Sequence, residues 1–172
     1  MNAEDTAVKT FQEVWLWPAR PVTSEISASL VPTLAEAVLV AVRTIPKESL
    51  QRVAPQEAGV AYQPSMLLAL LTYCYASGLY ASEDIEQRMC QDADFCRVCA
   101  DEFPGALMLQ RFRRLNRDAL IRSLAHVLGS QQEQQGATCA TTSLPDQDAT
   151  ERSLLDQARQ RIRTAIQFDL ND

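Results

Sequence analysis

The densest group of chemically active side chains is a run of arginines between Leu107 and Arg122. At 3.6 residues per turn, one face of a helix there carries an amide and three guanidinium groups, from Gln110, Arg113, Arg114 and Arg117. A second face is apolar and carries Met108, Phe112, Leu115 and Ala119. Two further arginines, Arg111 and Arg122, flank the apolar seam.

Guanidinium groups bind phosphate or guanine through paired hydrogen bonds, and a glutamine amide pairs with adenine. The pattern therefore predicts a helix that is held by its apolar face and presents its polar face to duplex DNA. The predicted DNA contacts are Gln110, Arg111, Arg113, Arg114, Arg117 and Arg122. The same pattern is also typical of a solvated arginine face that binds nothing.

The rest of the chain is acidic. The net charge of the 172 residues is −6 and the sequence pI is about 4.8, which weighs against nucleic acid as a partner. Residues 82–102 carry a net charge of −5, whereas residues 103–122 carry +4. If acidic side chains from 82–102 covered the arginines, the prediction of DNA binding would lose its main support.

The five cysteines include one CxxC pair, Cys96 and Cys99, with Cys90 upstream. Their three thiolates could hold a zinc ion, but neither a second close pair nor a nearby histidine is present to complete four ligands, since the only histidine is His126. We therefore expect buried thiols, no metal and no cofactor. No set of serine, histidine and aspartate suggests nucleophilic catalysis, so the chain is not expected to be an enzyme.

Helical spacing of apolar residues recurs along the chain and no strand pattern is visible, which predicts an all-α fold. The expected helices cover 32–43, 64–77, 82–90, 92–99 and 106–128, the last ended by a glycine at 129. The helix from Pro64 is apolar on every side and should be the centre of the core. We expect a helical bundle that contains a helix-turn-helix-like unit of three helices and a long basic helix.

The expected organisation is an N-terminal arm at 1–23, a helical domain at 24–129, a polar linker at 130–149 and an amphipathic helix at 150–168. The longest apolar runs are too short to span a membrane, and the acidic N-terminus is unlike a signal peptide. The sequence thus favours a cytoplasmic protein without membrane contact.

Five short motifs between residues 62 and 114 follow one another in a familiar order. They are YQPSMLL at 62–68, YCYASG at 73–78, SEDIEQR at 82–88, DADF at 92–95 and, after Pro104, RFRR at 111–114. Together they resemble the N-terminal helical domain of insertion-sequence transposases of the DDE type. The resemblance implies a bacterial or archaeal source, binding to the terminal inverted repeats of a mobile element, and a nuclease domain that follows.

After Leu128 only 44 residues remain, which is too few for such a nuclease domain. Two-metal phosphoryl transfer needs carboxylates that converge from a rigid sheet, and the late acids Asp169 and Asp172 lie on no predicted strand. We therefore expect a non-catalytic, transposase-derived module, either a truncated transposase or a regulator, that binds double-stranded DNA. Its protein partner would be a second copy or the cognate full-length transposase.

An alternative function stays open. A domain that has lost DNA binding could serve as a protein-interaction or dimerisation module. The acidic segment 82–102, the tryptophans at 15 and 17 and the C-terminal helix would then form the interface.

Overall fold

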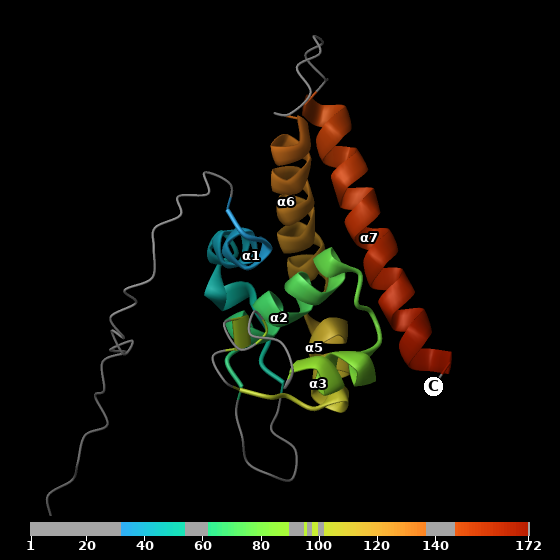
Figure 1. The fold of residues 1–172 in the computed structure, drawn as a ribbon. Helices are drawn as coiled ribbons and strands as arrows, with labels where there is room; N and C mark the ends of the chain where they lie inside the picture. Colours follow the sequence, from blue (N-terminus) through green and yellow to red (C-terminus); the bar gives the residue numbers. More distant parts are fainter. Residues whose placement is uncertain are drawn as a thin grey trace, which may run out of the picture. The chain divides into compact units, whose positions relative to one another are not determined.

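The protein is all-helical across the part of the chain that the computed structural model describes, as the sequence predicts. Described are residues 32–53, 62–89, 95, 98–99, 102–136 and 147–171. The helices are α1 (Leu34–Arg43), the 3₁₀ turn η1 (Lys47–Ser49), α2 (Pro64–Ser77), α3 (Ser82–Met89), α5 (Ala106–Leu115), α6 (Arg117–Gly136) and α7 (Gln147–Asn171) (Figure 1). The expected arm at 1–23 and most of the expected helix at 92–99 lie outside these residues.

Helix α2 is the centre of the core, and its predicted bounds are confirmed. Pro64 occupies the first turn, where a missing N–H costs nothing, and Gly78 ends the helix with a φ of 88°, a left-handed conformation that favours glycine. Leu68, Leu71 and Tyr75 are completely buried. The helix packs against α1, α5, α6 and α7, which explains why it is apolar on every side.

Helix α1 begins at Leu34, two residues later than expected. The Thr33 hydroxyl accepts a hydrogen bond from the N–H of Glu36, and the Glu36 carboxylate accepts one from the N–H of Thr33. This reciprocal capping box, rather than the preceding proline, defines the start of the helix.

The expectation of one continuous helix over 106–128 is wrong. The chain leaves helical geometry at Asn116, where φ is −115° and ψ is 31°, so that α5 and α6 are separate helices. The end predicted at Gly129 is also wrong, because α6 continues to Gly136. A Cβ atom at position 129 would stand 3.3 Å from the side chain of Leu154, so this glycine permits close packing of α7 rather than ending α6.

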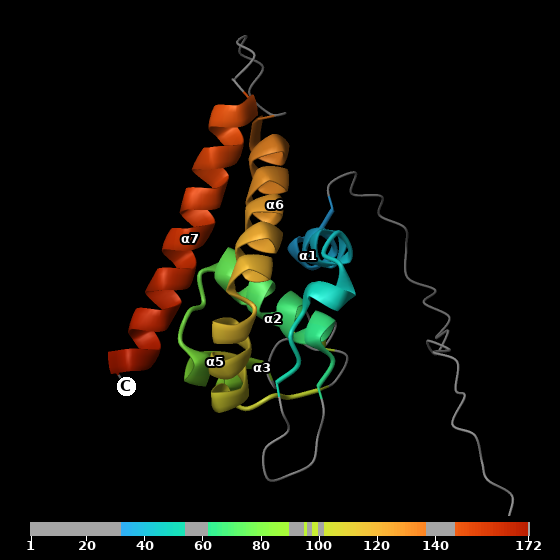
Figure 2. The ribbon, with the colours of Figure 1, turned by 180° about the vertical axis from the view of Figure 1, so that it is seen from behind.

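Helix α6 lies between α1 on one side and α7 on the other, and both views show α6 and α7 running antiparallel (Figures 1 and 2). Three buried residues of α7, Ala158, Ile162 and Ala165, join the core cluster. Thus the C-terminal amphipathic helix folds back onto its own chain. None of the described helices is both long enough and apolar enough to cross a lipid bilayer.

Candidate nucleic-acid interface

The face of α5 that enters the core differs from the predicted one. Its buried residues are Leu109, Phe112 and Arg113, whereas Met108 is only partly buried and Leu115 is exposed. The core face is thus turned around the helix axis by about one residue, from the side of Met108 to the side of Leu109. Of the predicted apolar face, Phe112 is completely buried, Met108 and Ala119 pack against the edge of the core, and Leu115 is exposed.

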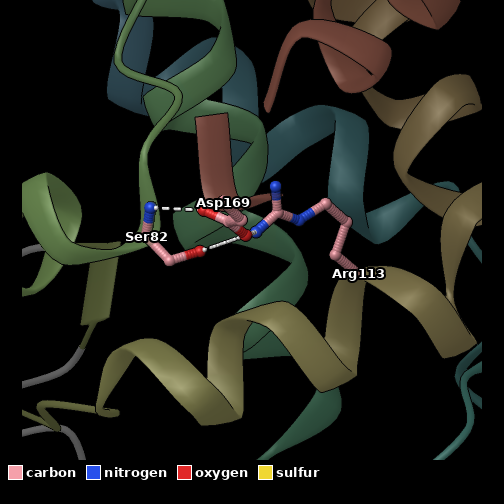
Figure 3. Close-up of polar contacts among 3 residues, drawn as sticks. All are labelled: Ser82, Arg113 and Asp169. Carbon is pink, nitrogen blue, oxygen red and sulfur yellow. Dashed lines mark hydrogen bonds and ion pairs between the residues drawn. The ribbon is translucent and has the colours of Figure 1, made fainter. Parts of the chain in front are cut away.

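Arg113 is turned inward, so the expectation that it shares the exposed polar face is wrong. The residue is 1% exposed, and its Nη2 atom forms an ion pair with Oδ2 of Asp169 in α7 (Figure 3). Nη2 also lies 2.6 Å from the hydroxyl oxygen of Ser82, and Cζ lies 5.9 Å from the centre of the Tyr75 ring. The guanidinium enters the core because a carboxylate, a hydroxyl and an aromatic face together replace the water it loses.

Asp169 also caps α3. Its Oδ1 accepts a hydrogen bond of 3.0 Å from the backbone N–H of Ser82, and its Oδ2 accepts one of 3.0 Å from the Ser82 hydroxyl (Figure 3). A carboxylate at a helix N-terminus is favoured by the exposed N–H groups and by the helix dipole. Ser82 is the first residue of α3, and the acid that caps this helix comes from the far end of the chain.

The other predicted contacts remain at the surface. Arg111, Arg114, Arg117 and Arg122 are exposed, and Gln110 is half-buried. Arg114 on α5 and two arginines of α6, Arg117 and Arg122, line one groove of about 400 Å³. The rest of the lining includes Ser49 and Gln51, which lie in and just after η1, and one acid, the exposed Asp118 of α6, so the groove keeps a net positive charge from its three arginines. The structure therefore brings three of the six predicted residues together; Gln110 and Arg111 lie outside this groove, and Arg113 is buried.

Asn116, which the arginine pattern does not single out, ties the junction of α5 and α6 to the segment after η1. The Asn116 side chain accepts a hydrogen bond of 2.7 Å from the backbone N–H of Gln51 and donates one of 2.9 Å to the backbone carbonyl of Gln51. These bonds hold Gln51, which lines the groove, against Asn116 at the junction of α5 and α6. Arg114 and Arg117 lie on either side of this junction. The available signal was an asparagine, a residue with low helix propensity, inside an otherwise helical pattern.

The nearby acids of α3 do not line this groove. Glu83, Asp84 and Glu86 are exposed, and the Glu86 carboxylate accepts a hydrogen bond of 2.8 Å from the N–H of Ala106, the first residue of α5. Much of segment 90–101 lies outside the described residues. Within the described part, the acid that neutralises a predicted DNA contact is Asp169, not a residue of 82–102.

Helix α7 is held at a second point, which its sequence pattern does not predict. Nη1 of Arg161 donates hydrogen bonds of 2.7 and 2.9 Å to the backbone carbonyls of Tyr75 and Ala76, in the last turn of α2. A cation at a helix C-terminus is favoured by the carbonyl groups and by the dipole.

Two of the cysteines are described and both, Cys74 and Cys99, are buried. Cys90 and Cys96 lie outside the described residues, and so does the geometry of the CxxC pair. Within the described ranges, no group of three or more histidine, cysteine, aspartate or glutamate side chains is placed to hold a metal ion.

Comparison with known proteins gives one match. Residues 37–115, just under half of the chain, match a family model described as a transposase domain (DUF772). No curated protein and no solved structure gives a significant match. The matched region runs from α1 to the end of α5 and excludes α6 and α7.

Proposed function

We propose, from the premise that residues 37–115 are a transposase-family domain, that the protein is a non-catalytic module that binds duplex DNA. The groove at the junction of α5 and α6 would bind the DNA backbone through Arg114, Arg117 and Arg122. The observation that carries this proposal is the gathering of three exposed arginines from two helices in one concave surface of a chain that is otherwise acidic.

The exposed face of α5 extends this surface. Successive residues of a helix are 100° apart, so Arg111 and Gln110 lie on either side of Arg114 around the axis. Arginine binds phosphate oxygens or the guanine edge through paired hydrogen bonds, and glutamine pairs with adenine. The expected contacts are therefore Gln110, Arg111, Arg114, Arg117 and Arg122. Helices α3 and α5 pack against each other, as the helices of a helix-turn-helix unit do.

A non-catalytic role agrees with the contacts made by two carboxylates of the described helices, Glu86 and Asp169. Glu86 and Asp169 bind backbone N–H groups at the starts of α5 and α3, and Asp169 also pairs with Arg113. These contacts are structural, whereas two-metal phosphoryl transfer needs several carboxylates directed at one point.

Salt dependence of DNA binding tests the proposal. Four phosphate contacts give a slope of log K against log salt of about −3.6 for duplex DNA, and each lost contact reduces its magnitude by about 0.9. We expect Arg114→Gln and Arg117→Gln each to reduce the slope by that amount in a fluorescence anisotropy titration. Arg163→Gln, an exposed arginine of α7 outside the groove, is the matched control and should leave the slope unchanged. Absence of binding at low salt would refute the proposal.

The protein-interaction alternative is favoured by one observation. Leu107 is 63% exposed on the outer side of α5, close in sequence to the half-exposed Phe103. An apolar side chain there could meet a second copy of the chain. Light scattering tests self-association through this patch, because a dimer that Leu107→Gln dissociates would support a dimerisation module, and a monomer at all concentrations would exclude one.

A further inference from the structure

We propose that Ser82 and Arg113 form a phosphate-binding socket, which the carboxylate of Asp169 fills in the free protein. This inference deepens the proposed function and rests on it, because the phosphate would belong to the DNA backbone. The partner is therefore a phosphate oxyanion, and Asp169 is its internal competitor.

The donors in the socket are those that bind oxyanions. The N–H of Ser82 lies in the first turn of the eight-residue helix α3, and its hydroxyl and Nη2 of Arg113 reach the same carboxylate (Figure 3). Three donors from two helices thus converge on one anion.

The socket also holds a donor that the carboxylate does not use. Nη1 of Arg113 is buried and has no hydrogen-bond partner among the described residues, although buried donors are nearly always satisfied. A carboxylate has two oxygen atoms, and both are already bound here. In a backbone phosphodiester, the two charged oxygens stand wider apart on a tetrahedral phosphorus than those of a carboxylate, and two ester oxygens stand beside them, so one group can contact both terminal nitrogens of the guanidinium.

The socket and its present occupant come from different parts of the chain. Ser82 and Arg113 lie inside the region that matches the transposase domain, and Asp169 lies outside it. Around the axis of α5, Gln110 lies between Arg113 and Arg114. Uncovering Arg113 would therefore extend the proposed DNA-binding face without a gap.

The last turn of α7 is weakly held apart from Asp169. Leu170 is 71% exposed, and Phe168 is half-exposed and stacks on Tyr80 with ring centres 6.3 Å apart. Few buried apolar contacts fix this turn, so it can lift while the rest of α7 stays on α6.

The test compares four full-length proteins in anisotropy titrations with duplex DNA over a range of salt. Asp169→Asn should steepen the salt slope by about 0.9, which corresponds to one additional phosphate contact. The affinity ratio between low and fourfold higher salt then grows about threefold. Asp148→Asn removes the same charge from an exposed position of α7 and should leave the slope unchanged. The double variant Asp169→Asn with Arg113→Gln should return to the wild-type slope.

A second arm uses inorganic phosphate against chloride at matched ionic strength. Phosphate should raise the Tm of Asp169→Asn and leave the Tm of the double variant unchanged. The exposed acids Glu83 and Asp84 lie in the first turn of α3 beside Ser82 and weaken the binding of free phosphate. The DNA titrations are therefore the more sensitive of the two experiments.

The outcomes separate the socket from the proposed function. If the wild type binds DNA and Asp169→Asn has the same slope, the socket is refuted and the proposed function stands. If no variant binds DNA, the proposed function fails, and the phosphate arm decides whether the socket binds free phosphate. Should Asp169→Asn fail to fold by circular dichroism, Phe168→Ala loosens the last turn without touching the ion pair. A steeper slope in that variant supports the socket, whereas a wild-type slope contradicts the lifting of the last turn by which DNA would reach it.

Discussion

At the scale of single residues, the contact that matters most is the buried pair of Arg113 and Asp169. Two charges lose their hydration there, and their attraction offsets this loss only because Ser82 and the Tyr75 ring supply further contacts. Such a pair contributes little net stability, but removing one partner leaves the other charge buried and unpaired.

Replacing Arg113 by alanine should therefore lower the free energy of unfolding much more than replacing its neighbour Arg114. We expect Arg113→Ala to lower the free energy of unfolding by about 2–4 kcal/mol, measured by urea denaturation. Arg114→Ala removes an exposed side chain and should cost about 0.5 kcal/mol or less. Equal losses in the two variants would contradict the burial of Arg113.

Cys74 gives a prediction for pH. Burial raises the pKa of its thiol well above the ordinary value, and Cys99 nearby adds to the increase. The folded protein then keeps this proton while the unfolded chain releases it above the ordinary thiol pKa of about 8.5, so the free energy of unfolding falls as pH rises beyond that value. We expect the free energy of unfolding of Cys74→Ala, measured by urea denaturation, to fall less steeply with pH than that of the wild type, by about 1.4 kcal/mol per pH unit. Parallel pH profiles of the two proteins would show that the thiol ionises equally in both states.

At the scale of elements, the sequence predicts the helices well and their orientation less well. The bounds of α2 follow from its proline and glycine, because these residues act locally. The buried face of α5 could not be predicted, because the partners that admit Arg113 to the core lie on other elements, and Asp169 is 56 residues away. The break at Asn116 likewise depends on a bond to the backbone of Gln51, 65 residues away. Local periodicity contains no information about such distant polar partners.

The junction of α5 and α6 can be tested through Asn116. Replacement by alanine leaves the N–H and carbonyl of Gln51 without their partner, so we expect Asn116→Ala to cost about 1–3 kcal/mol in urea denaturation. The same variant should weaken DNA binding, since Arg114 and Arg117 lose their fixed spacing. An unchanged DNA affinity would show that this junction does not position the arginines.

At the scale of the whole molecule, α7 fastens onto helices of the region that matches the transposase domain model. It packs along α6, binds the end of α2 through Arg161 and caps α3 through Asp169. The candidate groove was partly predictable from sequence, because Arg114 and Arg117 lie on exposed helix faces near one another. Its other wall, Ser49 and Gln51, depends on the tertiary packing of the segment after α1.

The packing of α7 on its own chain leads to a paired prediction. Ile162 is completely buried, whereas its neighbour Arg163 is exposed. We expect Ile162→Asp to lower the free energy of unfolding by about 3 kcal/mol or more, because it places a charge in the core. Arg163→Asp should change it by about 0.5 kcal/mol or less. Similar thermal unfolding of the two variants would mean that α7 does not pack on this core in solution.

The most direct test of DNA binding by the arginine groove is the salt dependence of duplex affinity in the wild type and in Arg114→Gln combined with Arg117→Gln. Four phosphate contacts, from Arg111 and the three arginines of the groove, predict a slope of about −3.6 for the wild type and about −1.8 for the double variant. Equal slopes in the two proteins, or no binding by the wild type at low salt, would contradict the account.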